Sequence, residues 1–249
     1  MDISRGASHA EAAPSTGTTI VACTYKGGVV LGADGRVSIG NYIMNRASNK
    51  IAPLSDFIYL CRSGSAPDTQ IISDNVKHYL DQMIAESGEE PTVEAAANLV
   101  RLINYNNKDH LVGAMLVVGW DKHGGGQVFG APIGGTLAKE KWAIDGSGST
   151  YIWGYCDSEF REDMTRAEAE QWVKEAVALA MTRDASSGGV IRLITLDGTG
   201  AHHTYVQGDQ VPQFIDDMPF PGRDPVALPL PGAAPAPVPA AAEGGMVIG

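Results

Sequence analysis

Short apolar segments occur in pairs along this chain of 249 residues, and a glycine-containing turn joins the members of each pair. One pair flanks the Lys-Gly-Gly turn at residues 26–28, a second flanks the turn at 123–126, and a third flanks the Asp-Gly turn at 197–198. Strand-like segments separated by such turns are typical of β-hairpins, whose strands run antiparallel. We therefore expect sheets that are largely antiparallel.

Two helical segments follow the first strands, because apolar residues there recur with helical spacing. The first begins near Ser65, where Pro67 suits the first helical turn and Asp68 suits a capping box, and it ends at Gly88. The second begins near Thr92. Residues 57–61, which precede the first of these helices, have the composition of a strand.

A third helix is predicted to begin at Thr165, where Glu168 completes a capping box. Its apolar stripe consists of Ala169, Trp172, Val173, Ala176, Val177 and Ala180. The chain thus alternates strands, two helices, strands, one helix and strands. This order predicts an α+β protein.

The composition excludes several classes of protein. The hydrophobic fraction is 44%, which is too high for a disordered chain. The formal charge of −11 argues against a protein that neutralises nucleic-acid phosphates. Apolar segments are too short to span a membrane. Three cysteines without a CxxC pair indicate reduced thiols in a cytosolic or nuclear compartment, and we expect no disulfide framework.

The two ends of the chain differ in composition from its middle. Residues 1–17 are small and polar without a strand or helix period, so we interpret them as a disordered or removable leader. Nine of the 14 prolines lie between Pro212 and Pro239, and residues 214–249 form a Pro/Ala-rich extension. A tail or linker is the simpler interpretation of this extension, and a specific docking peptide is the alternative.

Several kinds of site have no support in the sequence. The six histidines lack metal-ligand spacing with Cys or carboxylates, and we expect no metal site. His202 and His203 lie near a strand end, where their rings would point to opposite faces. Gly-Ser-Gly at 146–148 lacks the lysine of a phosphate-binding loop, and we expect no nucleotide site.

One threonine stands where a leader meets the first strand, in the sequence Gly17-Thr18-Thr19. If the bond after Gly17 were cut, Thr18 would carry a hydroxyl and an α-amine. An α-amine has an ordinary pKa of about 7.7–8.0, so it could deprotonate the neighbouring hydroxyl directly or through a water. Taken alone, the tripeptide is more often simply the start of a strand.

The spacing of other motifs gives this threonine its context. Thr18, Asp34 and Lys50 follow one another at intervals of 16 residues. The motifs Ala-Asp-Gly-Arg at 33–36, Asn-Lys at 49–50, Gly-Ser-Gly-Ser at 146–149 and Arg-Asp-Ala-Ser-Ser-Gly-Gly at 183–189 accompany them. With these motifs the chain resembles the proteasome β subunits over residues 18–213. One departure is Gly35, where the family usually has a small polar residue.

The resemblance implies a fold and a set of catalytic residues. The fold is the four-layer α-β-β-α sandwich of N-terminal-nucleophile hydrolases, with two antiparallel sheets. Self-cleavage between Gly17 and Thr18 would activate this zymogen. Thr18 would then be nucleophile and base, with Lys50 lowering its pKa and Asp34 holding Lys50. The remaining polar residues and the oxyanion donor would be Ser147, Asp184, Ser187 and the backbone N–H of Gly64.

Arg62 follows Cys61 at the position that forms the base of the family's pocket for the residue before the scissile bond. A guanidinium there would pair with a carboxylate. The chain therefore resembles the β1 type, a threonine endopeptidase that cleaves after acidic residues (caspase-like). By the same resemblance Val37, Ser48 and Ala66 would line the pocket. Each of these residues could instead have a structural role only, and Arg62 could be a surface arginine.

The resemblance also implies partners and a compartment. The chain would assemble with other α and β subunits in stacked heptameric rings and degrade unfolded polypeptides in the ubiquitin–proteasome system, in cytoplasm and nucleus. No cofactor, nucleic acid or membrane is implied. Two alternatives remain open at this point: a non-catalytic structural member of the β ring, and a stand-alone N-terminal-nucleophile amidase.

Overall fold

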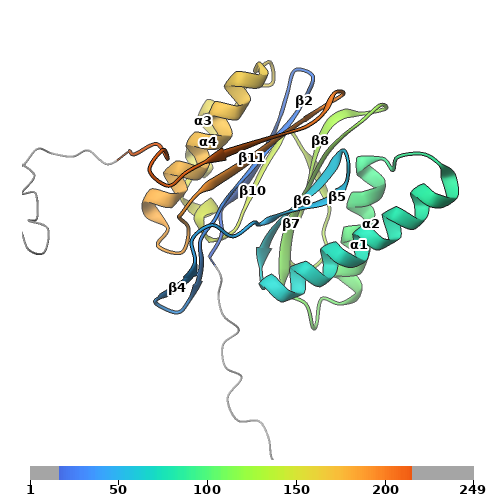
Figure 1. The fold of residues 1–249 in the computed structure, drawn as a ribbon, viewed down its shortest axis with the longest axis horizontal. Coiled ribbons are helices and arrows are strands. Elements are labelled where there is room, and N and C mark those ends of the chain that lie inside the picture. Colours follow the sequence, from blue (N-terminus) through green and yellow to red (C-terminus); the bar gives the residue numbers. More distant parts are fainter. Residues whose placement is uncertain (1–16, 215–249) are drawn as a thin grey trace, which may run out of the picture. The chain divides into compact units, whose positions relative to one another are not determined.

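The computed structural model describes residues 17–214, so the predicted leader, except Gly17, and the predicted extension, except Phe214, lie outside the described residues. The described chain forms two five-stranded sheets and one two-stranded sheet. Every strand pair in this range is antiparallel, which confirms the prediction from the paired segments. Figure 1 shows the order of the elements along the chain.

The strands are β1 (Ile20–Tyr25), β2 (Gly28–Asp34), β3 (Val37–Ile39), β4 (Tyr42–Asn45), β5 (Ile51–Ser55), β6 (Ile58–Gly64), β7 (Gly113–Asp121), β8 (Gly125–Ala131), β9 (Ala138–Glu140), β10 (Trp142–Asp145), β11 (Ile191–Asp197) and β12 (Gly200–Val206). The helices are α1 (Ala66–Ser87), α2 (Val93–Asn106), the 3₁₀ helix η1 (Ser147–Tyr151), α3 (Trp153–Glu159) and α4 (Arg166–Arg183).

The two large sheets lie between helices (Figure 1). One sheet has the strand order β10-β1-β2-β11-β12, and α4 packs on it through β1, β2 and β11. The other has the order β5-β6-β7-β8-β9, and α1 and α2 pack on its strands. The resulting α-β-β-α arrangement is the predicted four-layer sandwich of the N-terminal-nucleophile hydrolases.

Three buried clusters correspond to the three interfaces between these layers. The predicted stripe of the third helix is fully buried against β1, β2 and β11, with Trp172 and Val173 among its members. A second cluster joins α1 and α2 to their sheet, and a third fills the space between the two sheets, where Leu31 packs near Leu116. Apolar burial of this kind contributes roughly 25 cal/mol per Å².

Helix caps explain where the helices begin and end. The predicted capping box of α4 is present, since Thr165 and Glu168 each accept from the other's backbone. Thr92 caps α2, so the helix begins where the sequence predicted. The capping box predicted for α1 is wrong: the Ser65 side chain makes no cap hydrogen bond, and Asp68 accepts instead from the backbone N–H of Val112 at 3.1 Å.

Element boundaries differ from the prediction in places that matter for the site. The strand predicted at 57–61 runs to Gly64 as β6, so its last residues pair with β7. The strand β10 and the short helices η1 and α3 were not predicted. β10 has only four residues and follows Lys139, Glu140 and Lys141, so its apolar run of three residues is too short to mark a strand.

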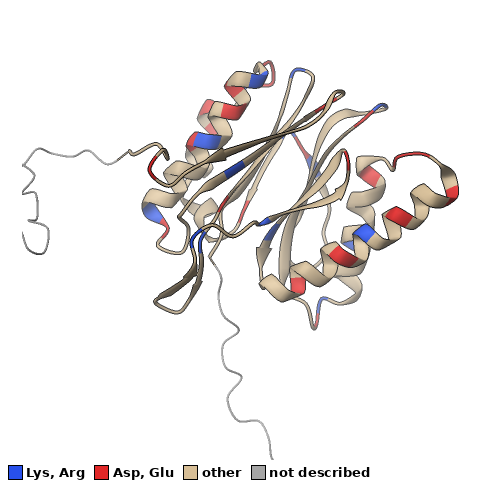
Figure 2. Cartoon of the chain, in the orientation of Figure 1, with Lys and Arg blue, Asp and Glu red and all other residues tan. Residues whose placement is uncertain are grey.

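Charged residues gather on the helices and connecting turns, as Figure 2 shows. The strands that face the sheet-to-sheet core are largely apolar. Among residues 17–214, no helix has the length and apolar character needed to cross a membrane. Cys23, Cys61 and Cys156 are all buried free thiols.

Candidate active site

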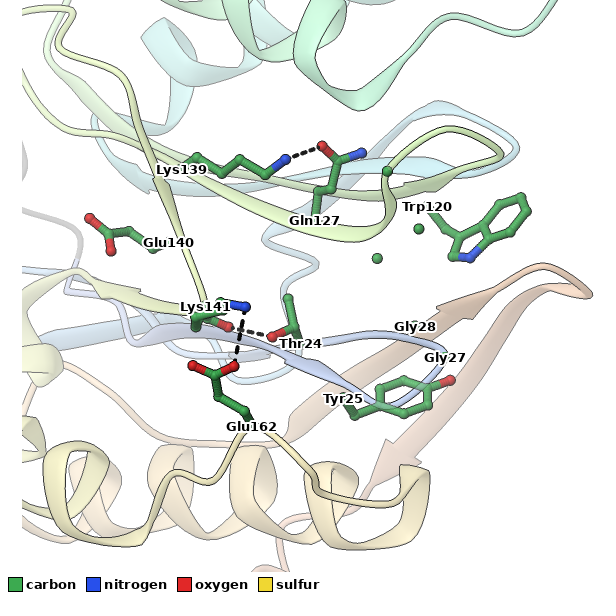
Figure 3. Close-up of a pocket in the computed structure, with 13 residues that line it drawn as sticks. Thr24, Tyr25, Gly27, Gly28, Trp120, Gln127, Lys139, Glu140, Lys141 and Glu162 are labelled. Carbon is green, nitrogen blue, oxygen red and sulfur yellow. Dashed lines mark hydrogen bonds and ion pairs between the residues drawn. The ribbon is translucent and has the colours of Figure 1, made fainter.

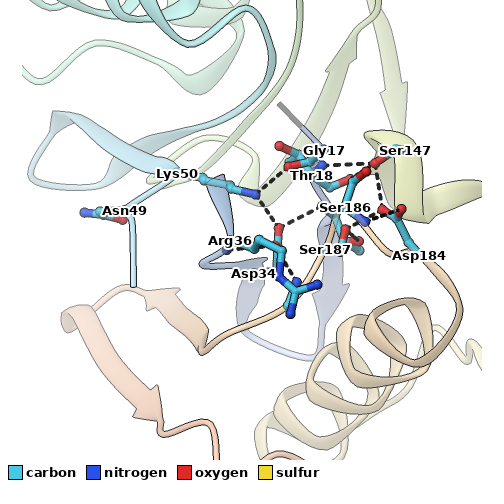
Figure 4. Close-up of polar contacts among 12 residues, drawn as sticks. Gly17, Thr18, Asp34, Arg36, Asn49, Lys50, Ser147, Asp184, Ser186 and Ser187 are labelled. Carbon is cyan, nitrogen blue, oxygen red and sulfur yellow. Dashed lines mark hydrogen bonds and ion pairs between the residues drawn. The ribbon is translucent and has the colours of Figure 1, made fainter. Parts of the chain in front are cut away.

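Asp34 and Lys50 form a buried ion pair at one end of the sandwich (Figure 4). Asp34 is the last residue of β2, and Lys50 directly precedes β5. The Lys50 Nζ lies 2.7 Å from Asp34 Oδ1. Burial lowers the pKa of the Lys50 amine from its ordinary value, and the neighbouring carboxylate of Asp34 acts in the opposite direction. The pair is therefore enclosed by protein and differs from a solvated ion pair on the surface.

The Asp34 carboxylate is wholly buried and receives hydrogen bonds on both oxygens. Besides Lys50, Oδ1 accepts from the backbone N–H of Thr19 at 2.9 Å. Oδ2 accepts from the backbone N–H groups of Arg36 at 3.1 Å and Gly188 at 3.0 Å. A buried charge is tolerated when it is paired and hydrogen-bonded in this way. These bonds fix the direction in which Asp34 holds Lys50.

The peptide bond between Gly17 and Thr18 lies directly beside this pair (Figure 4). Lys50 Nζ donates to the Gly17 carbonyl oxygen at 2.9 Å. Thr18 is 3% exposed and lines a cavity with Lys50. Only glycine fits at residue 17, since a Cβ there would lie 1.8 Å from the Cβ of Ser186. The carbonyl that precedes Thr18 is therefore held against a cation.

A second polar cluster lies on the other side of Thr18 and centres on Asp184, the C-cap residue of α4. Its Oδ2 accepts from Ser147 Oγ at 2.7 Å and from Ser187 Oγ at 2.6 Å. The backbone N–H of Thr18 donates to Ser147 Oγ at 3.1 Å. The nitrogen of Thr18 thus connects to Asp184 through one hydroxyl.

Arg62 lies on β6 beside a cavity of about 50 Å³ that Thr18 also lines. The other residues that line this cavity are Val37, Ser48, Asn49, Lys50, Gly64, Ala66 and Thr69. Arg62 is half-buried, and its Nη2 donates to the Asn49 carbonyl oxygen at 3.2 Å. Its Nε is buried and has no hydrogen-bond partner among residues 17–214. Because Arg62 lines the cavity, its guanidinium is placed beside that space, and guanidinium groups pair well with carboxylates.

Gly64 occupies the end of β6 next to this cavity. Its φ of 99° lies in the region that favours glycine, and a Cβ there would lie 2.9 Å from the Val112 carbonyl oxygen. Gly64 and Thr18 line the same cavity. The structure brings all the predicted site residues together at one end of the sandwich, and the roles implied for them remain predictions.

Sequence reasoning assigned no role to two residues that shape the site. The Arg36 Nη1 donates to the Ala185 carbonyl oxygen at 2.7 Å and so holds the loop that carries Asp184 and Ser187. Asn49 orients Arg62 through its backbone carbonyl, which no side-chain pattern reveals. The only signals available were the motifs at 33–36 and 49–50, in which Arg36 and Asn49 stand.

A larger cavity, of about 740 Å³, lies at the far end of β1, near the turns at Gly27 and Gly124 (Figure 3). Both of its lysines interact with neighbouring side chains: Lys141 Nζ lies 3.3 Å from Glu162, and Lys139 donates to Gln127 at 2.7 Å. The Thr24 hydroxyl, which also lines this cavity, donates to the Lys141 carbonyl oxygen at 3.0 Å. The chemistry described above is confined to the Thr18 end.

The described residues include no group of three or more His, Cys, Asp and Glu side chains placed to hold a metal ion. His202 and His203 contact different partners, as expected for neighbours on one strand. His203 Nε2 lies 3.5 Å from the Tyr59 hydroxyl, and His202 Nε2 lies 3.1 Å from the Thr199 hydroxyl.

Comparison with known proteins gives one consistent family. Residues 14–196 match the family of proteasome subunits. The chain is 50% identical over 198 residues to "Proteasome subunit beta type-6" of Dictyostelium discoideum, covering 80% of this chain and 92% of that protein. It is 45% identical over 202 residues to "Proteasome subunit beta type-9" of Homo sapiens, covering 81% and 92%. It is 48% identical over 189 residues to "Probable proteasome subunit beta type-1" of Schizosaccharomyces pombe, covering 76% and 84%.

Proposed function

The chain belongs to the proteasome β-subunit family, and we propose that it is a catalytic member whose nucleophile is Thr18. The observation that carries this proposal is the position of the Gly17–Thr18 peptide between two polar clusters. Lys50 contacts its carbonyl oxygen at 2.9 Å, and Ser147 accepts from its nitrogen at 3.1 Å. A non-catalytic subunit would have no need of this arrangement.

The first reaction at this site would be self-cleavage. Lys50 polarises the Gly17 carbonyl, and the Thr18 hydroxyl attacks its carbon. The C–N bond breaks as an ester forms between Gly17 and Thr18 Oγ, and the hydroxyl proton passes to the nitrogen, which leaves as a free amine. Water then hydrolyses the ester and releases the leader with a carboxyl end. Until this step the nitrogen is an amide and cannot act as a base.

The same residues would then act on a substrate. The freed amine takes the proton of the Thr18 hydroxyl, and Oγ attacks the carbonyl of the scissile peptide. Lys50 stabilises the negative charge that develops on Oγ, and the N–H of Gly64 receives the oxyanion. The protonated amine returns its proton to the leaving group, and water hydrolyses the remaining ester.

Substrate preference would come from Arg62. A half-buried guanidinium that lines a cavity beside the nucleophile favours a carboxylate there and disfavours a large apolar side chain. We therefore assign the chain to the caspase-like β1 type. As a proteasome β subunit it assembles with other subunits of the 20S particle, and we place that particle in cytoplasm and nucleus, degrading unfolded polypeptides marked by ubiquitin.

Replacing the nucleophile tests the catalytic assignment. In assembled particles that carry Thr18→Ala, we expect residues 1–17 to remain attached and cleavage of a fluorogenic peptide ending in Glu to be lost. Apart from the retained leader, the assembled particle should keep its mass, because residue 18 precedes β1 and the substitution leaves the strand unchanged. Intact-mass spectrometry and the peptide assay measure both. Undiminished cleavage of the acidic peptide in mutant particles would instead support a non-catalytic ring member.

Replacing Arg62 tests the specificity assignment. In Arg62→Ala particles, the ratio of cleavage rates for a peptide with Glu and one with Leu before the reporter should fall by roughly 10–150-fold, the value of one charged hydrogen bond. Arg161→Ala is the matched control, because Arg161 is exposed and pairs with Glu168 on the surface. An unchanged ratio in Arg62→Ala particles would remove the pocket assignment.

A further inference from the structure

Thr19 contacts both polar clusters of the site, and the proposed function gives it no role. Its backbone N–H donates to Asp34 Oδ1 at 2.9 Å, on the side of Lys50. Its hydroxyl lies 2.7 Å from Ser187 Oγ, on the side of Asp184. The residue is completely buried. Thr19 therefore joins the two clusters directly behind the nucleophile.

The direction of the hydrogen bonds follows from counting protons. Ser187 has a single hydroxyl proton, and it points to Asp184 Oδ2 at 2.6 Å, because an ionised carboxylate can only accept. The short contact between the two hydroxyls must then have Thr19 as its donor. Ser147 likewise spends its proton on Asp184 at 2.7 Å and accepts from the Thr18 nitrogen.

The hydroxyl of Thr19 is enclosed by protein. A Cβ at residue 148 would lie 1.9 Å from Thr19 Oγ1, so the Gly148 backbone closes over this hydroxyl. Ser187 is 1% exposed. Without the Thr19 hydroxyl, the oxygen of Ser187 would lose its donor inside a closed site.

We propose that Thr19 is a positioning residue whose hydroxyl, by donating to Ser187, keeps Asp184 and Ser147 oriented to receive the N–H of the Thr18 amine. This role rests on the proposed function. An amine that donates to Ser147 keeps its lone pair for the Thr18 hydroxyl, which is what a general base requires. The hydrogen bonds along this chain also strengthen one another.

The proposal has a consequence that depends on pH. When Thr19 no longer donates, Ser187 becomes a weaker donor and the Asp184 carboxylate carries more uncompensated charge. A stronger negative charge near an amine favours its protonated form. The amine would then remain protonated, and inactive as a base, up to a higher pH. The acid limb of the pH–rate profile should move upward.

The experiment compares Thr19→Val, which keeps the shape, with Thr19→Ser, which keeps the hydroxyl. Thr18 is exposed by a removable ubiquitin fusion, so that self-cleavage is not needed, and assembled particles are assayed with the Glu peptide. For Thr19→Val we expect kcat to fall about tenfold, KM to change little and the acid limb to rise by about half a pH unit. Thr19→Ser should restore both.

Thr195→Val is the matched control. Thr195 lies on β11 and is also buried, and its hydroxyl donates to Glu170 of α4 at 2.7 Å. It should leave kcat and the acid limb unchanged. Thr19→Ala, which adds no methyl group, is measured alongside in case the valine variant does not assemble, and it should show the same shift of the acid limb.

Two results would overturn the role of Thr19: wild-type kcat and acid limb in Thr19→Val or Thr19→Ala, or a lower kcat with an unmoved limb that Thr19→Ser does not restore. Either result leaves the proposed function intact as long as wild-type particles cleave the Glu peptide and Thr18→Ala particles do not. Absence of Thr18-dependent cleavage in wild-type particles would mean that the proposed function itself has failed.

Discussion

Asp34 and Lys50 show how much of this site depends on burial of single residues. A lysine amine enclosed by protein loses hydration, and that loss lowers its pKa. Asp34 opposes this lowering, and four donors, including Lys50 itself, hold its carboxylate in place. The same pair on the surface would contribute about 0–1 kcal/mol. In the buried site, the ion pair with Asp34 determines whether Lys50 is positively charged next to Thr18.

Replacing Asp34 by Asn should shift the alkaline side of the activity profile. The contribution of Asp34 that raises the pKa of Lys50 disappears while the burial that lowers it remains, so Lys50 loses its proton at a lower pH. The cation that stabilises charge on Thr18 Oγ is then lost earlier as pH rises. We expect the alkaline limb of kcat to move to lower pH, together with a lower yield of particles, because breaking a buried pair costs about 3–5 kcal/mol.

The control for this variant is Asp81→Asn, since Asp81 pairs with Lys77 at 3.2 Å on the exposed face of α1. That change should leave the pH profile as it is. An Asp34→Asn particle whose alkaline limb coincides with that of the wild type would show that Lys50 does not supply the charge.

Residues with a recurring spacing were predictable, and residues that act through their backbone were not. Thr18, Asp34 and Lys50 were identified through the resemblance to the proteasome β subunits, which their spacing supports, and the structure places Lys50 against both Asp34 and the Gly17 carbonyl. Asn49 contributes a carbonyl oxygen to Arg62, a function that any residue type could perform. Thr19 was visible in the Gly-Thr-Thr motif, but its partner Ser187 is 168 residues away.

At the level of elements, α4 links the stability of the fold to the site. The helix begins at a capping box and ends at Asp184, whose backbone N–H donates to the Ala180 carbonyl oxygen at 2.8 Å. Its buried face packs on β1, β2 and β11. The position of Asp184 is therefore fixed by packing along the whole helix and not by its first turn.

Removing the cap of α4 should separate local stability from activity. Thr165→Ala removes the acceptor for the Glu168 N–H and should cost about 1 kcal/mol, which makes the amides of the first turn exchange roughly fivefold faster. The kcat of assembled particles should not change, because the opposite end of α4 carries Asp184. Hydrogen exchange followed by mass spectrometry measures the first effect. Thr165→Ser keeps the cap and serves as control; a parallel loss of kcat in Thr165→Ala would refute the separation.

Elements with a long apolar period were predicted well, and short ones were missed. The stripe of α4 and the hairpin of β1 and β2 follow directly from their patterns. β10 escaped because it has four residues, yet it pairs with β1 from Ile20 to Cys23 and so supports the strand that follows Thr18. Its identity as a strand depends on pairing with a segment more than a hundred residues earlier in the chain, which no local pattern records.

At the level of the whole molecule, the two sheets bring distant parts of the chain to one end. Thr18 precedes β1, Asp34 ends β2, Lys50 precedes β5, Ser147 begins η1 and Asp184 follows α4. The antiparallel order places these termini together because β1, β2 and β11 are neighbours in one sheet and β5 and β6 in the other. The site therefore exists only in the folded sandwich.

The most direct test of this account is the N-terminal residue of the chain in active particles. Mass spectrometry of the subunit, isolated from particles that cleave the Glu peptide, should show that it begins at Thr18, with residues 1–17 released. Detection of only the full-length chain in such particles would mean that the nitrogen of Thr18 is still an amide during catalysis, and the proposed mechanism would be wrong.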